Sequence, residues 1–203
     1  MIKLHYHPIS SYSLRVQIAA AEKGIELDLS LVNFTNKQQQ SEQYKSLNPY
    51  GRVPAIEDGD FVLYESSTIL HYLEDKYPNI PLMPNNIQDK ALVNLHMRLC
   101  DLEFANHTGF ILKQVVLLPK EQWDLEGIRD AKEKISNHLE KLAKDVNGKS
   151  FLVADQFTLA DVCYSTFVPY LTTIGINTPD ELLPWIKNIS DRESVKSLLP
   201  KTV

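Results

Sequence analysis

A nine-residue segment, Pro78–Asn86, divides this chain into two parts of different character. The segment holds three prolines and three asparagines. Because proline lacks a backbone N–H and has a fixed φ angle, such a segment forms neither a helix nor a sheet ladder. Strand-like patterns occur only before it, whereas long helical patterns follow it. We therefore predict an α/β domain over residues 1–77, a linker over 78–86 and an all-helical domain over 87–203.

The first part predicts strands and helices in the order βαβ, α, ββ, α. Strands over 3–7 and 25–31 flank a helix over Ser11–Glu22, and a helix between two strands makes them parallel. The later elements are a short helix over 42–47, strands over 55–57 and 61–64, and a helix over 66–76. Asp58-Gly59 is a hairpin signal, so the last two strands are antiparallel. This pattern predicts a mixed four-stranded sheet.

The second part carries helical periodicity over 87–118, 121–146, 158–171, 178–186 and 191–199. Within it, Thr158 and Asp161 have the spacing of a reciprocal N-terminal cap, flanked by Phe157 and Val162 at the hydrophobic staple positions. We interpret this cap as a folding signal, whose loss costs about 1 kcal/mol of stability.

Charge and apolar content exclude several classes of partner. Lys plus Arg is 21 and Asp plus Glu is 26, a net charge of −5, which attracts neither nucleic acid nor an anionic membrane. No apolar run approaches the roughly 18 residues that span a bilayer, and the first residues do not resemble a secretory leader. We therefore expect a cytoplasmic protein, with Cys100 and Cys163 as buried, reduced packing residues.

The motifs of several other chemistries are missing. The sequence has no G-x-S-x-G turn, no phosphate-binding glycine loop and no H-E-x-x-H pair. His5 and His7 alternate on one predicted strand, but no third ligand is indicated beside them. We therefore predict no metal site.

Four short strings carry a resemblance to a known family. They are Ser10–Val16 (SSYSLRV), Asn48–Pro54 (NPYGRVP), Glu65-Ser66 and Phe157–Asp161 (FTLAD). In this order and spacing they resemble the cytosolic glutathione transferases, of a serine-type and bacterial-like class, over essentially the whole chain. The resemblance implies a thioredoxin-like N-terminal domain that binds glutathione, a helical domain that lines the electrophile site, and a homodimer.

The chemistry that this resemblance implies begins with the glutathione thiol. A free thiol has a pKa near 8.5, and lowering it by about two units needs roughly 2.7 kcal/mol of thiolate stabilisation. A hydroxyl donor to a charged acceptor supplies about 1.5–3 kcal/mol. The resemblance to serine-type classes assigns this role to Ser10, with Ser11 and Tyr6 as alternatives from other classes. Helix capping equally explains a serine in this turn, and Ser13 is predicted as an exposed first-turn or cap residue.

The resemblance also implies how the rest of glutathione is held. Val53, before a cis Pro54, would offer its backbone N–H and C=O to the cysteinyl part. Ser66, at a helix start, suits the γ-glutamyl carboxylate, and Glu65 the ammonium of the same group. Arg15 is expected to be a structural ion-pair partner and not a catalytic group.

The glycine end of glutathione has a weaker predicted grip. Gln39 and Gln40 stand where family members often carry a His and a Lys, and Gln brings no charge to a carboxylate. Arg52 either offsets that missing charge or faces solvent. The run Gln38–Gln40 is equally compatible with a plain solvated loop.

The function implied is attack of the glutathione thiolate on a small electrophilic compound. Two alternatives remain open: glutathione-dependent isomerisation of maleylacetoacetate, and a non-catalytic interaction module with the same fold. The isomerising class has a cysteine where this chain has Tyr12. An aromatic and apolar stripe is the candidate electrophile site, although such a stripe is also typical of a helical core: Phe104, His107, Phe110, Ile111, Tyr164 and Phe167.

Overall fold

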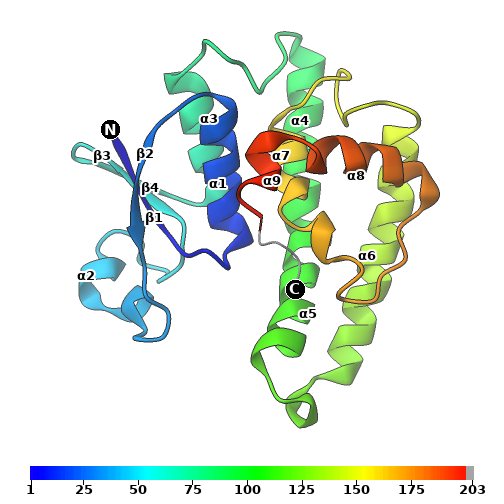
Figure 1. Cartoon of the computed structure of the whole chain (residues 1–203), viewed down its shortest axis with the longest axis horizontal. Coiled ribbons are helices and arrows are strands. Elements are labelled where there is room, and N and C mark those ends of the chain that lie inside the picture. Colours follow the sequence, from blue (N-terminus) through cyan, green and yellow to red (C-terminus); the bar gives the residue numbers. More distant parts are fainter. Residues whose placement is uncertain (200–203) are drawn as a thin grey trace. The chain divides into compact units, whose positions relative to one another are not determined.

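The computed structural model describes residues 1–199 of the chain, which divides into two compact units (Figure 1). Unit 1 comprises Met1–Leu82 together with the segment that begins at Glu193, and unit 2 comprises Met83–Arg192. The predicted domain boundaries differ from this division in two respects. The first residues of the predicted linker and the last helix both belong to unit 1.

Unit 1 is built on a four-stranded mixed sheet with the strand order β2-β1-β3-β4. The strands are β1 (Ile2–Tyr6), β2 (Leu27–Leu31), β3 (Ala55–Asp58) and β4 (Phe61–Tyr64). β1 and β2 are parallel, whereas β3 is antiparallel to both β1 and β4. This confirms the predicted fold class, including the hairpin at Asp58-Gly59.

The strand register brings several loops to one end of the sheet. Ala55, the first residue of β3, pairs with His5 on one side and with Tyr64 on the other. Leu31, the last residue of β2, pairs with Tyr6, the last residue of β1. The segments that follow β1, β2 and β4 and the segment that precedes β3 therefore all start from the same end of the sheet.

Two helices, α1 (Ser11–Glu22) and α3 (Ser66–Lys76), pack against each other and cover one face of this sheet (Figure 1). Their shared core consists of Ile2, Leu4, Val16, Ile56, Ile69 and Leu73. The short helix α2 (Glu42–Lys45) contributes Tyr44 to a second cluster with Val32 and Val53. The ring of His5, which alternates with Leu4 along β1, lies edge-on to Tyr44, so α2 covers the other face.

A buried ion pair holds the start of the predicted linker. Lys23 Nζ donates to Glu74 Oε2 at 2.6 Å and to the Ile80 carbonyl at 2.7 Å. Glu74 also accepts a hydrogen bond from the backbone N–H of Leu82 at 3.1 Å. The Pro/Asn-rich segment is therefore fixed to unit 1 as far as Leu82.

The last described helix, α9 (Glu193–Lys196), packs on α1. Val195 is fully buried, and the Ser194 hydroxyl donates to the Glu22 carboxylate. These contacts join the last described helix to the first helix within unit 1.

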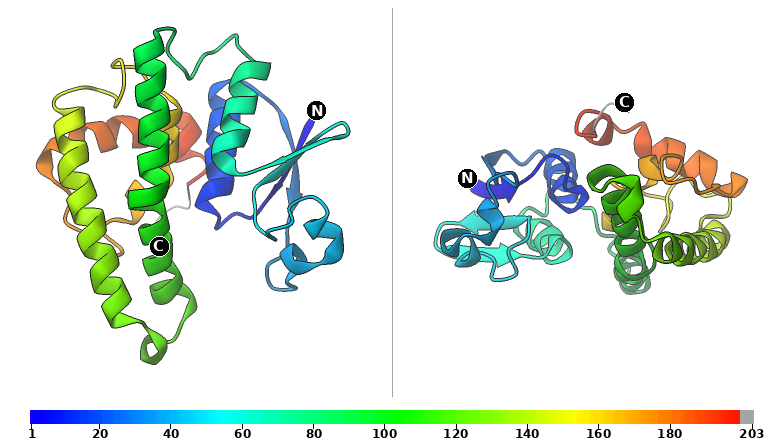
Figure 2. Two further views of the ribbon diagram at one scale, coloured as in Figure 1. Left: turned by 180° about the vertical axis from the view of Figure 1, so that it is seen from behind. Right: turned by 90° about the horizontal axis from the view of Figure 1, so that it is seen from below.

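Unit 2 is helical, as predicted. Its helices are α4 (Ile87–Leu99), α5 (Asn106–Leu117), α6 (Leu125–Val146), α7 (Leu159–Ser165) and α8 (Leu183–Ser190). α4 and α5 form one rod, joined by a π-helical segment over Cys100–Ala105, and α6 runs antiparallel to it (Figures 1 and 2). The helix predicted over 158–171 ends at Ser165 because Pro169 cannot donate to a continued helix; residues Val168–Tyr170 form a 3₁₀ turn instead.

The predicted cap at the start of α7 is present, and it includes hydrogen bonds from residues beyond the predicted pair of Thr158 and Asp161. The Asp161 carboxylate accepts hydrogen bonds from Thr158 N (2.9 Å), Thr158 Oγ1 (3.0 Å), Leu152 N (3.1 Å) and Trp185 Nε1 (2.8 Å). Burial raises the pKa of Asp161 above its ordinary value, although these hydrogen bonds act in the opposite direction. Asp161 therefore joins α7, the preceding loop and α8.

Residues 1–199 also bear on the expectations for cysteines, membrane-spanning helices and metal ligands. Cys100 and Cys163 are buried and are not joined in a disulfide, as predicted. Within this range, the helices are all too short or too polar to cross a bilayer. The same range contains no group of three His, Cys, Asp or Glu side chains arranged to hold a metal ion.

Candidate functional site

Ser10 is the N-cap residue of α1. Its Oγ accepts a hydrogen bond from Ser13 N at 3.2 Å, and its backbone carbonyl accepts from Leu14 N at 3.0 Å. A hydroxyl has one proton to donate and two lone pairs, so capping leaves the proton of Ser10 available to a ligand. The half-buried hydroxyl also lies at the positive end of the helix dipole, which favours a nearby anion.

The alternative hydroxyls lie in different surroundings. Ser11 is the buried first residue of α1, and Tyr6 packs against the apolar core of unit 1. Ser13 is fully buried, which contradicts the expected exposed position, and Ser10 rather than Ser13 provides the cap. The helix periodicity does not reveal this, because α1 is buried on most of its surface and not along one stripe.

The loop before β3 presents Val53 next to a cis proline. The Val53-Pro54 peptide bond is cis, as the resemblance implied. The preceding carbonyl, that of Arg52, is fixed by two donors, Tyr44 Oη and Asn48 Nδ2, each at 2.8 Å. Burial raises the pKa of Tyr44, which therefore keeps its proton for this hydrogen bond. Val53 itself lies before the first paired residue of β3, outside the sheet ladder.

The glutamine run lies against this loop. Residues Gln38–Gln40 form a 3₁₀ turn, and Gln40 Nε2 donates to the Gly51 carbonyl at 3.4 Å. A side chain at Gly51 would meet the Gln39 carbonyl at 2.7 Å, and its φ of +61° also favours glycine. The buried Gln39 Oε1 has no hydrogen-bond partner within the described chain. The arrangement is more ordered than a plain solvated loop, and the Arg52 side chain beside it is exposed.

Glu65 and Ser66 occupy the turn from β4 into α3. Glu65 has φ 71° and ψ 114° and makes no side-chain cap. For a residue with a side chain, these backbone angles cost about 1–3 kcal/mol of conformational strain, and such strain is concentrated at functional sites. The N–H groups at the start of α3 are therefore left uncapped by this side chain, as an anion site requires.

Arg15 contacts this turn from α1. Its guanidinium is fully buried, lies 4.8 Å from the centre of the Tyr12 ring and donates from Nη1 to Ser66 Oγ at 3.4 Å. Ser66 is also buried. Sequence reasoning assigned Arg15 a structural role and missed its contact with a predicted ligand-binding residue.

Two domain families match the chain. Residues 9–76 match the glutathione S-transferase N-terminal domain, and residues 110–193 match the glutathione S-transferase C-terminal domain. A glutathione S-transferase from Triticum aestivum is 37% identical over 166 residues, which cover 76% of this chain and 71% of the wheat protein. The chain belongs to the glutathione S-transferase family.

Two other proteins are similar over nearly the whole chain of this family member. The crystal structure of glutathione transferase F2 from Populus trichocarpa is 25% identical, with a TM-score of 0.86 and coverage of 98% of this chain and 97% of the poplar chain. The stringent starvation protein A homolog of Coxiella burnetii is 28% identical over 206 residues, covering 100% of this chain and 93% of that protein. The poplar structure confirms the predicted combination of a thioredoxin-like and a helical domain.

Unit 2 contains all of the candidate electrophile residues. Phe104, Ile111, Tyr164 and Phe167 are all buried in the interior of unit 2. Tyr164 is hydrogen-bonded through Oη to His138 Nε2 at 2.9 Å, and its ring packs near Phe104. These four side chains have the surroundings of core residues rather than of residues that line an open site. His107 and Phe110 are half-exposed.

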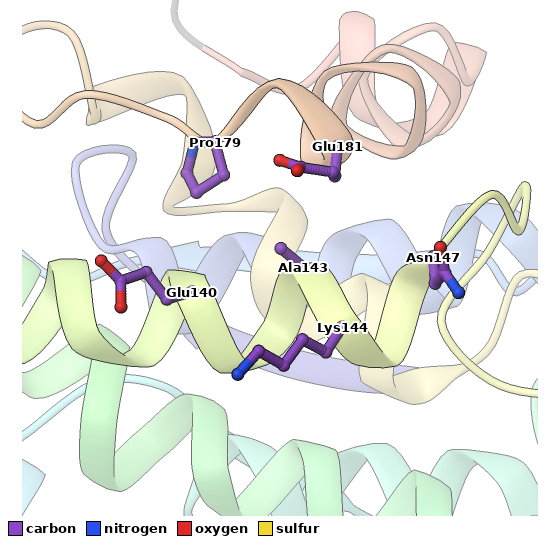
Figure 3. A pocket seen from close by; sticks show the side chains of 6 residues that line it. All are labelled: Glu140, Ala143, Lys144, Asn147, Pro179 and Glu181. Carbon is purple, nitrogen blue, oxygen red and sulfur yellow. The ribbon is translucent and has the colours of Figure 1, made fainter.

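A separate pocket on unit 2 involves none of the predicted site residues. It has a volume of about 450 Å³ and is lined by Glu140, Ala143, Lys144, Asn147, Pro179 and Glu181. Figure 3 shows that Glu140 and Lys144 project from α6, whereas Pro179 and Glu181 belong to the segment across from it. The pocket is open, and its lining includes carboxylate, amine and amide groups. No sequence motif predicted it.

Proposed function

We propose that this chain is a cytoplasmic glutathione transferase that binds glutathione on unit 1 and activates its thiol for attack on small electrophilic compounds. The observation that carries the proposal is the strand register. The pairing of His5 with Ala55 and of Ala55 with Tyr64 sets three chain segments at one end of the sheet. Those segments hold Ser10, Val53 and Ser66 respectively.

Each segment suits a different part of the tripeptide. The uncapped start of α3, with Ser66, suits the γ-glutamyl carboxylate, and the Glu65 carboxylate suits the ammonium group. The backbone of Val53, which lies outside the sheet ladder, suits the cysteinyl part, which would add to it as an extended strand. Gln39, Gln40 and Arg52 lie on the side proposed for the glycine end, and of these three residues Arg52 carries the positive charge.

Ser10 is the proposed thiolate donor. Its hydroxyl proton would hydrogen-bond to the sulfur, and the α1 dipole would add to the stabilisation of the anion. The thiol loses its proton to solvent, and the thiolate sulfur forms a bond to the electrophilic carbon. In a substitution the leaving group departs with the electron pair of the bond that breaks. Lowering the thiol pKa increases the thiolate fraction near neutral pH and so the rate.

The test measures both binding and turnover. Isothermal titration with glutathione should give saturable binding, and a pH series with 1-chloro-2,4-dinitrobenzene should show a rate that rises with an apparent pKa below 8.5. S-methylglutathione, which has no ionisable thiol, should compete for binding without reacting. A chain that binds no glutathione at millimolar concentration contradicts the proposal.

A second candidate function is favoured by one relative that is not named as a transferase, the stringent starvation protein A homolog, whose likeness extends over the whole of this chain. In this case the fold would act as a non-catalytic interaction module. It predicts no retention on immobilised glutathione, whereas the transferase proposal predicts retention and elution by free glutathione. The same enzyme preparation, assayed with maleylacetoacetate, tests the isomerase alternative, in which glutathione is required but not consumed.

We also propose that the chain forms a homodimer through α4. Leu92, Leu95 and Leu102 are exposed and recur at helical spacing along α4 and the π-helical segment. A continuous exposed apolar stripe of this kind is typical of protein interfaces. The interface is isologous in a twofold dimer, because the same stripe of each copy meets the other.

A further inference from the structure

The strongest unassigned feature of unit 1 is the contact between Arg15 and Ser66. The two residues lie on different helices, 51 positions apart, and both are buried. Arg15 has only donors, so Ser66 Oγ must be the acceptor in this hydrogen bond. The contact therefore fixes which way the hydroxyl of Ser66 faces.

The direction of this hydrogen bond determines what Ser66 offers to a ligand. One lone pair of Oγ is directed to the guanidinium, so the O–H proton of Ser66 must point elsewhere. Within residues 1–199, that proton has no hydrogen-bond acceptor. A ligand carboxylate at the start of α3 would be such an acceptor, and the guanidinium charge behind the hydroxyl strengthens an O–H donor.

We propose that Arg15 is a positioning residue for the carboxylate of the γ-glutamyl group: it orients the Ser66 hydroxyl as a donor and supplies the positive charge behind it. This inference rests on the proposed binding of glutathione and identifies the cation that holds its γ-glutamyl end. The cation comes from α1, inside unit 1.

The spacing along α1 matches the separation of two groups of such a ligand, the thiol and the γ-glutamyl carboxylate. Ser10 caps the helix and Arg15 follows five residues later, so the two are separated by about 7.5 Å along the helix axis. An extended chain covers about 3.3–3.6 Å per residue, so the distance corresponds to about two residues. One helix can therefore address the thiol with its cap and the γ-glutamyl carboxylate with its second turn.

The test compares two ligands that differ in a single carboxylate. Glutathione and 4-aminobutyryl-cysteinyl-glycine, which lacks only the γ-glutamyl carboxylate, are titrated calorimetrically into the full-length chain. The wild type should bind glutathione about tenfold to a hundredfold more tightly, the range for a hydrogen bond to a charged group. Arg15→Met and Ser66→Ala should each remove most of this ratio, and the double variant should lose little more than either single one.

A conservative variant of Arg15 and a control variant on α3 complete the test. Arg15→Lys retains the buried charge but not the position of Nη1, so its ratio should fall by less; it replaces Arg15→Met if that variant does not fold. Thr68→Ala, at an exposed residue in the first turn of α3, should keep the wild-type ratio. In kinetics with a fixed electrophile, the Arg15 variants should raise the KM for glutathione more than they lower kcat.

The outcomes separate the inference from the function. If the Arg15 variants bind both ligands more weakly but keep the wild-type ratio, Arg15 is only structural and the inference is wrong. If the wild type binds neither ligand, the proposed function fails, and the inference with it. If the wild type binds both ligands equally, glutathione binding stands but the carboxylate is not read by Ser66 and Arg15.

Discussion

Ser10 Oγ accepts a hydrogen bond from the backbone N–H of Ser13 at 3.2 Å, so the proposed thiolate donor also caps the helix that begins beside it. Capping and donation use different parts of one hydroxyl, and the two roles are compatible. They nevertheless complicate a simple alanine substitution, because Ser10→Ala would remove both at once.

Paired substitutions at Ser10 separate the two roles. Ser10→Ala should lower the free energy of unfolding by about 1 kcal/mol through loss of the cap, whereas Ser10→Gly should lower it by only a few tenths. Both should raise the pKa of the bound thiol by about one to two units, equivalent to a lost hydrogen bond to a charged group. The pH–rate profile with glutathione measures this pKa. An unchanged profile in both variants transfers the role to Ser11 or Tyr6, which Ser11→Ala and Tyr6→Phe then test.

A cation at the proposed glycine end should strengthen binding. Gln40→Lys should lower the KM for glutathione by up to about fivefold at low salt, because an exposed ion pair contributes about 0.2–1 kcal/mol. The gain should shrink at high salt and vanish with the glycine monoethyl ester of glutathione. Gln43→Lys, on the exposed side of α2, is the matched control. Equal effects of the two lysines would mean that Gln40 does not face the glycine carboxylate.

The hydrogen bonds to Asp161 should contribute more to the free energy of unfolding than the roughly 1 kcal/mol expected of the predicted cap. Asp161→Asn keeps the size of the side chain but removes the charge to which four donors are directed, so we expect a loss of about 3–5 kcal/mol in the free energy of unfolding. Urea unfolding measures this loss. Asp155→Asn is the control, because Asp155 is exposed and also accepts from backbone N–H groups, those of Ser150 and Phe151. A loss of about 1 kcal/mol in both variants would contradict this prediction and mean that Asp161 contributes no more than an ordinary helix cap.

His138 should make the stability depend on pH. Burial lowers its pKa to about 4, from 6.5, so between these values the unfolded chain binds more protons than the folded chain. The contribution of neutral His138 is fully present above pH 6.5 and is lost as the pH falls towards 4, by up to about 3 kcal/mol. His138→Gln, which keeps a hydrogen-bonding group for Tyr164, should flatten this dependence in urea unfolding at pH 5 and pH 7. Burial also lowers the pKa of His96 and His107, so part of the slope should remain.

A charge in the exposed stripe of α4 should prevent dimer formation. Leu95→Glu places a carboxylate in the apolar surface that the proposed interface would bury, and an unpaired buried charge is strongly unfavourable. Light scattering after gel filtration should show a monomer for this variant and a dimer for the wild type. Leu183→Glu, at an exposed leucine of α8, should leave the dimer intact. A monomeric wild type would rule out the proposed interface.

Local signals predicted some elements to the residue. The bounds of α1 and α3 agree with prediction because each helix has a polar residue at its start, and Gly24 and Pro78 follow closely after their ends. The Thr158 and Asp161 pair was found for the same reason, since the two partners are three residues apart. By contrast, the Trp185 and Leu152 donors to Asp161 come from distant positions that no local pattern links.

Features that depend on tertiary packing were not predictable in the same way. The contact between Arg15 and Ser66 spans 51 residues, so only the fold brings it about. Periodicity placed Phe104 and Tyr164 on inward helix faces, but a core and a ligand site give the same apolar pattern. The π-helical segment Cys100–Ala105 likewise has no proline or glycine that would mark it.

The contact of α9 with α1 has a consequence for synthesis of the chain. Unit 1 is discontinuous and unit 2 is inserted within it, and α9, which carries the fully buried Val195, packs on α1. Chains emerge from the ribosome N-terminus first. The sheet, α1 and α3 can therefore assemble early, but the surface that α9 covers stays open until more than nine-tenths of the chain has been made. A fragment ending at Leu82 would keep its Lys23 and Glu74 clamp and still lack this cover.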